Sequence, residues 1–83
     1  MKHTVSKQAA KILQSMDDIT RQRIKQGIRE IPGGDIKPMR GFSDGRQRLR
    51  IGKYRVVFVY VADEDGNKGV HVIELGSRGG IYK

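Results

Sequence analysis

The chain has 83 residues, no cysteine, and 17 lysines and arginines against nine aspartates and glutamates, which gives a net charge of +8. This length predicts one small domain over residues 1–83, and the lack of cysteine excludes disulfides and thiolate metal sites. Because no apolar run is long enough for a membrane span or a signal peptide, we expect a cytoplasmic protein. The charge favours a polyanionic partner, which is nucleic acid, an acidic protein or anionic lipid.

A short amphipathic helix is predicted near the N-terminus. Residues 1–5 are either an edge strand or an unstructured start. Ser6 is a suitable N-cap for the helix that follows, with Val5 placed to pack on Ala10. Apolar residues then recur at the i, i+3, i+4, i+7 spacing of one helical face, at Ala9, Ile12, Leu13 and Met16.

A second helix follows a tight link at Asp17-Asp18, either of which can serve as its N-cap. Its apolar stripe consists of Ile24, Ile28 and Ile31, and residues 32–34, Pro-Gly-Gly, end it. Gly27 weakens the helix and suggests a close approach by the neighbouring helix. The basic residues outside the stripe are expected to face solvent, or alternatively ribosomal RNA: Arg21, Arg23 and Arg29. Two such helices predict an αα-hairpin.

A β-hairpin is predicted around Gly52-Lys53. Residues 35–45 read as a connector, because their proline and glycines disfavour regular structure. Two β-rich runs then flank Gly52-Lys53, a pair suited to a two-residue turn with glycine first. This turn sets the cross-strand pairs as Ile51 with Tyr54, Arg50 with Arg55, Leu49 with Val56, and Arg48 with Val57.

The predicted register divides the hairpin into an apolar and a basic face, since side chains alternate along each strand. The apolar face carries Leu49, Ile51, Tyr54, Val56 and Phe58. The other face carries Arg46, Arg48, Arg50 and Arg55 beside Val57 and Val59. We expect the helices to cover the first face and an anion to bind the second. The alternative is that the arginines are ordinary edge-strand charges that prevent aggregation.

One more strand completes the predicted sheet. After a polar turn at residues 63–67, apolar residues form a last strand that stops at Gly76: Val70, Val72, Ile73 and Leu75. Helices followed by strands predict an α+β fold, in which an N-terminal two-helix hairpin packs on a three- to four-stranded antiparallel β-sheet.

Four motifs occur in a fixed order along nearly the whole chain. They are Met39-Arg40-Gly41, the run RLRIGKYR at 48–55, Gly76 with Arg78, and Tyr82. This set resembles the RelE/ParE toxin superfamily of bacterial and phage toxin–antitoxin modules. The resemblance implies a RelE-like fold with a small sheet around a basic site. In the RelE branch it implies metal-independent endonucleolytic cleavage of mRNA in the ribosomal A site, and in the ParE branch inhibition of DNA gyrase.

The resemblance also implies roles for individual residues. Arg55 matches the family's phosphate-binding arginine, and Arg78 matches an arginine with a transition-state or leaving-group role. Tyr82 matches an aromatic residue that stacks on a base, although it could equally be a packing residue or part of a frayed end. Arg48 falls where many RelE members have a lysine or another residue proposed as general base. The further RNA-binding candidates are Arg40, Arg46, Arg50 and Lys53.

The general base is not evident from this set. RNA cleavage without a metal needs a base for the 2′-hydroxyl, positive charge at the phosphorane and an acid for the leaving oxygen. Arginine stays protonated, so Arg48 cannot easily accept a proton. The candidates are His71, Glu74, a tyrosine of lowered pKa and, less favourably, the exposed Lys53. A structural role is the alternative for His71.

We therefore predict a toxin that is an endoribonuclease of ribosome-bound mRNA. Its expected partners are a cognate antitoxin, mRNA and the ribosome, with no metal, cofactor or membrane. Val57 and Val59, apolar positions beside the arginines, are the expected antitoxin-docking surface. The alternative is a ParE-like gyrase inhibitor, or an inactive relative that binds only its antitoxin or nucleic acid.

Overall fold

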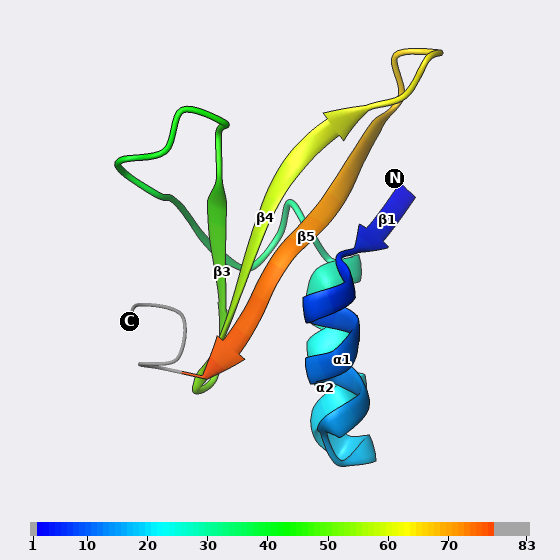
Figure 1. Ribbon diagram of the computed structural model, residues 1–83, viewed down its shortest axis with the longest axis vertical. Coiled ribbons are helices and arrows are strands. Elements are labelled where there is room, and N and C mark those ends of the chain that lie inside the picture. The colour runs from blue at the N-terminus through cyan, green and yellow to red at the C-terminus, as the bar shows by residue number, and fades with distance from the viewer. Residues whose placement is uncertain (1, 78–83) are drawn as a thin grey trace.

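Two helices and five strands follow one another along residues 2–77, the part of the chain that the computed structural model describes (Figure 1). In chain order they are β1 (Lys2–Val5), α1 (Lys7–Ser15), α2 (Asp18–Arg29), β2 (Asp35–Pro38), β3 (Gln47–Ile51), β4 (Tyr54–Ala62) and β5 (Lys68–Ser77). The strands form one sheet in the order β1-β5-β4-β3-β2. In it β1 runs parallel to β5, and the other neighbours are antiparallel. Neither helix is long and apolar enough to cross a membrane.

The predicted fold class, a two-helix hairpin on a three- to four-stranded antiparallel sheet, is wrong. The sheet has five strands and is mixed. β2 lies within the segment that was assigned to a connector, and its proline is tolerated because β2 is an edge strand. β1 pairs with a strand at the other end of the sequence, which no local pattern reveals. The helices also divide the sheet between them, with α1 against β5 and α2 against β3.

Ser6 joins the first strand, the first helix and the last strand. It is the N-cap of α1, as predicted, and its hydroxyl accepts a 3.1 Å hydrogen bond from the backbone N–H of Ala9. The same hydroxyl donates to the carbonyl oxygen of Ile73 at 2.6 Å. The backbone N–H of Ser6 donates to Val72 at 2.9 Å. These three bonds fix the start of α1 against β5.

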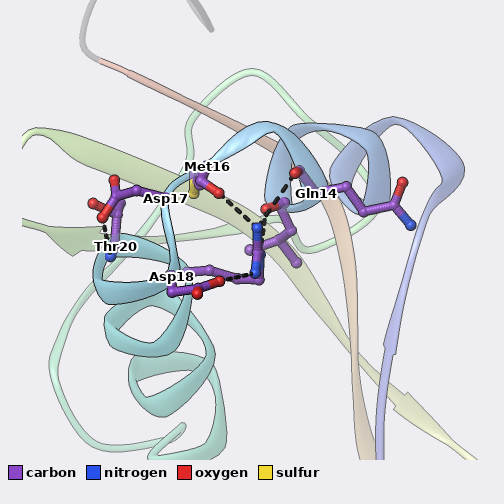
Figure 2. A network of polar contacts seen from close by, with 7 residues as sticks. Gln14, Met16, Asp17, Asp18 and Thr20 are labelled. Carbon is purple, nitrogen blue, oxygen red and sulfur yellow. Dashed lines mark hydrogen bonds and ion pairs between the residues drawn. The ribbon is translucent and has the colours of Figure 1, made fainter.

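The link between the two helices is closed by a polar network (Figure 2). Asp17 is the N-cap of α2 and accepts from the backbone N–H of Thr20 at 3.1 Å. Hydrogen bonds from Thr20 hold the pKa of Asp17 below its ordinary value of 3.8. Arg21 does not simply face solvent as expected, because its guanidinium donates to three backbone carbonyls at the end of α1 and to Asp18. It thereby adds hydrogen bonds to carbonyl groups at a helix end, where the regular intrahelical donors are missing.

The core lies between the helices and one face of the sheet. Its buried side chains are Ala9, Leu13, Ile24, Ile28, Ile31, Leu49, Val56, Phe58, Val70, Val72 and Leu75. Gly27 lies where α2 approaches β3, and a Cβ there would collide with the end of the Ile51 side chain. The close approach predicted for Gly27 is therefore made by a strand and not by the neighbouring helix.

The central hairpin has the predicted register. All four cross-strand pairs are confirmed, from Ile51 with Tyr54 to Arg48 with Val57. Gly52 has φ of +58°, and no residue other than glycine has a positive φ within the described chain. Glycine is therefore needed at the first position of this two-residue turn, as in a type II′ hairpin.

Candidate nucleic-acid interface

Cationic side chains cross the face of the sheet that points away from the helices. Because paired residues share a face, the pairings define two adjacent rows. One row runs from Asp35 through Arg50 and Arg55 to Gly76. The other row runs from Lys37 through Arg48 and Val57 to Glu74. We call these two rows the basic face.

A β-bulge decides which side chains of β5 reach this face. The register between β4 and β5 shifts between Val57 and Phe58, so that Val57 pairs with Glu74 while Val59 pairs with His71. Residues three apart on a regular strand would point to opposite sides. The extra residue, Ile73, brings both Glu74 and His71 to the side of the arginines.

A depression lies at the turn end of the basic face. It has a volume of about 290 Å³ and is lined by Arg50, Gly52, Lys53 and Arg55. Lys53 also lies over the ring of Tyr54, 5.5 Å from its centroid. Three cations around one depression attract an anion, and guanidinium groups suit the oxygens of a phosphate.

A larger cavity of about 520 Å³ lies at the other end, under the loop of residues 39–46 that joins β2 to β3. Its lining combines three arginines, one carboxylate and apolar groups: Arg40, Arg46, Arg48, Glu74, Pro38, Met39 and Phe42. Arg46 donates to Asp44 at 2.9 Å and lies 4.5 Å from the centroid of the Phe42 ring. This hydrogen bond from Arg46 holds the pKa of Asp44 below 3.8. Arg46 is thus held in place by two partners.

The structure brings six of the eight predicted site residues to this region. Arg48, Arg50 and Arg55 lie in the two rows, Lys53 lies at the turn, and Arg40 and Arg46 line the larger cavity. The other two, Arg78 and Tyr82, lie outside the described residues.

The candidate bases differ in their surroundings. Glu74 lines the larger cavity together with Arg48. His71 lies farther along β5, where its Nδ1 is 2.8 Å from the hydroxyl of Thr4 on β1. Tyr54 packs against the core on the helix side, and the ring of Tyr60 stacks edge-on against Phe58 at 5.3 Å. Among Glu74, His71, Tyr54 and Tyr60, only Glu74 lines the larger cavity, and it does so together with Arg48 of the basic face.

The docking surface predicted at Val57 and Val59 needs correction. Val57 is fully buried, so it offers no surface to a partner, whereas Val59 is partly exposed. Sequence reasoning also missed Lys37, because β2 was not expected, and Phe42, which is an exposed aromatic side chain flanked mainly by glycines and polar residues. That contrast between Phe42 and its neighbours was the available signal.

Two solved structures have a similar fold. One is the RelB–RelE antitoxin–toxin complex from Methanococcus jannaschii, with a TM-score of 0.69, 24% identity, and coverage of 95% of this chain and 94% of that chain. The other is the intact RelBE toxin–antitoxin complex from E. coli, with a TM-score of 0.60, 22% identity, and coverage of 92% and 94%. The chain shares the fold of a chain in each complex. No family model and no curated protein matches the sequence.

Proposed function

We propose that this chain is the toxin of a toxin–antitoxin pair and that it cleaves ribosome-bound mRNA without a metal ion. The observation that carries the proposal is the convergence of Arg48, Arg50 and Arg55 on one face of the sheet, with Glu74 beside them. The fold likeness to RelB–RelE chains supports it, because those structures are complexes of a toxin with its antitoxin.

The proposed reaction is attack of a ribose 2′-oxygen on the neighbouring phosphorus. The 2′-O–P bond forms, the bond from phosphorus to the 5′-oxygen breaks, and the products are a 2′,3′-cyclic phosphate and a 5′-hydroxyl. Charge builds up on the phosphate oxygens in the transition state, and fixed cations stabilise it. Arg48 and Arg55 supply this charge, and Arg78 stabilises the leaving oxygen, which takes its proton from water. Tyr82 stacks on a base and orients the nucleotide.

Glu74 is the proposed general base. A carboxylate can accept the proton of the 2′-hydroxyl, which an arginine cannot. Glu74 pairs with Val57, and Val57 pairs on its other side with Arg48, so base and cation lie on either side of one buried valine. His71 is less suitable, since it lies next to Thr4 and away from these arginines. The remaining cations, Arg40, Arg46, Arg50 and Lys53, bind the RNA backbone.

Primer extension on mRNA from cells that express the protein tests the proposal. We expect discrete cuts with the wild type and none with Arg55→Ala. Arg29→Ala is the matched control, because Arg29 is an exposed cation on α2, which packs on the other face of the sheet. Intact message together with a DNA-damage response would contradict the proposal and favour gyrase inhibition.

The proposed protein partner is a cognate antitoxin that covers the basic face. Val57 is buried, so the antitoxin contacts the cations themselves and not the side chain of Val57 between them. Co-expression with the product of the adjacent gene is expected to yield a complex that dissociates more readily at high salt. Recovery of the chain alone under the same conditions would contradict this assignment.

A further inference from the structure

Phe42 is an exposed aromatic side chain in the loop between β2 and β3. It is 45% exposed, and it is the aromatic residue of this eight-residue loop, 39–46. The loop is closed at its base by a 3.0 Å hydrogen bond from the backbone N–H of Met39 to the carbonyl oxygen of Arg46. Phe42 is absent from the buried core, so a role in core packing does not explain why an aromatic residue occurs at this position.

Arg46 and Asp44 hold one side of the Phe42 ring. The guanidinium carbon of Arg46 lies 4.5 Å from the ring centroid, and Asp44 fixes Arg46 through a 2.9 Å ion pair. An aromatic ring backed by a guanidinium is a layered surface of the kind on which an unpaired base stacks. Because Arg46 is fixed before any ligand arrives, little conformational entropy is lost on binding.

The ring lies beside the proposed cleavage site. Phe42 lines the same cavity as Arg48 and Glu74. The volume of this cavity, about 520 Å³, is within the usual range for ligand pockets, roughly 300–1,000 Å³. We infer that Phe42 is a stacking platform for one unpaired base of the RNA, next to the phosphate bound by the basic face. This inference rests on the proposed function, and it adds an aromatic contact in the β2–β3 loop to the one proposed for Tyr82.

A single fluorophore can report the stacking directly. The chain has no tryptophan, so Phe42→Trp introduces the only one. The probe is a single-stranded RNA 12-mer with 2′-O-methyl groups, which cannot be cleaved by 2′-hydroxyl attack. We expect this RNA to quench the fluorescence of the introduced indole, whereas an abasic strand with the same phosphates binds without quenching.

The affinity of the same RNA gives a second measurement. Fluorescence anisotropy should show binding about five- to one hundred-fold weaker for Phe42→Leu, and near wild-type binding for Phe42→Tyr. Tyr60→Leu is the matched control, because Tyr60 is 42% exposed on β4 and lies on the helix side of the sheet. It should bind like the wild type. Thermal melting by circular dichroism checks that each variant is folded.

The outcomes separate this inference from the function on which it rests. Tight binding by Phe42→Leu, together with unquenched fluorescence of the Phe42→Trp variant, overturns the platform while Arg55-dependent cleavage of mRNA stands. A 12-mer that binds neither variant nor wild type also overturns the platform. If the wild type shows no Arg55-dependent cleavage in cells but the RNA still quenches the Phe42→Trp variant, the nuclease is overturned and an RNA-binding protein is left.

Discussion

The guanidinium of Arg21 donates a 2.6 Å hydrogen bond to the carbonyl oxygen of Met16, the residue that caps α1. It also donates to the carbonyls of Leu13 and Gln14. One side chain of α2 therefore closes the end of the preceding helix.

Replacing Arg21 by lysine should destabilise the protein although the charge is kept. An ammonium on a single stem cannot reach the same set of carbonyls as the planar fork of arginine. Because hydrogen bonds to charged groups contribute about 1.5–3 kcal/mol each, we expect a loss of at least about 1.5 kcal/mol in urea unfolding. Arg29→Lys, on the exposed side of the same helix, should change stability little. Equal effects of the two substitutions would contradict the capping role.

Gly27 and Ile51 should be energetically coupled. Alanine is better than glycine in a helix by up to about 1 kcal/mol, but a Cβ at position 27 meets the Cδ1 of Ile51. Gly27→Ala should therefore stabilise the protein more in an Ile51→Val background, where that methyl group is gone, than in the wild type. A double-mutant cycle by urea unfolding measures the difference, and strict additivity would argue against the contact.

Glu74→Gln should abolish cleavage while leaving RNA binding intact. Loss of a general base lowers the rate by about 10²–10⁴-fold, whereas the neutral amide keeps the size of the side chain. His71→Gln is the matched control, since it lies on the same strand beside Thr4, and it should retain activity. Single-turnover cleavage of programmed ribosomes measures both. An active Glu74→Gln protein would remove Glu74 from the mechanism.

Asp17 should contribute to the acid sensitivity of the fold. Its pKa is lowered in the folded state by hydrogen bonds from Thr20. Its contribution is therefore fully present above its ordinary value of 3.8 and is lost as the pH falls through the lower folded value. Asp17→Asn keeps an N-cap acceptor without a titrating charge. We expect that variant to lose less stability than the wild type between about pH 5 and pH 2.5, as measured by thermal melting at each pH.

The parts of the fold that were predictable are those set by neighbours in sequence. The register of β3 with β4 followed from Gly52-Lys53, because a two-residue turn at these positions allows only one pairing of the two strands. The cap Ser6 followed from residue type and position, and the cap of the second helix was narrowed to Asp17 or Asp18, of which the structure uses Asp17. In contrast, β1 depends on a partner about 67 residues away, and β2 contains a proline that argues against a strand unless its edge position is known.

The candidate site was predictable to the same degree. The arginines of the hairpin share a face because their register is local, and the resemblance had already singled them out. Glu74 and His71 share that face only because of the bulge at Ile73, which the sequence does not mark. The position of Phe42 beside Arg48 and Glu74 depends on where β2 places the loop, so it could not be predicted before the sheet was known. The roles of Arg78 and Tyr82 remain predictions.

The pairing of β1 with β5 has a consequence for how the polypeptide folds during synthesis. Lys2 to Val5 pair with residues 69–72, so β1 cannot pair before β5 has been translated. The helices and the β3–β4 hairpin use contacts close in sequence and can form earlier. Until residues 69–72 have been synthesised, β1 therefore has no partner in the sheet, and its pairing follows the formation of the helices and the hairpin.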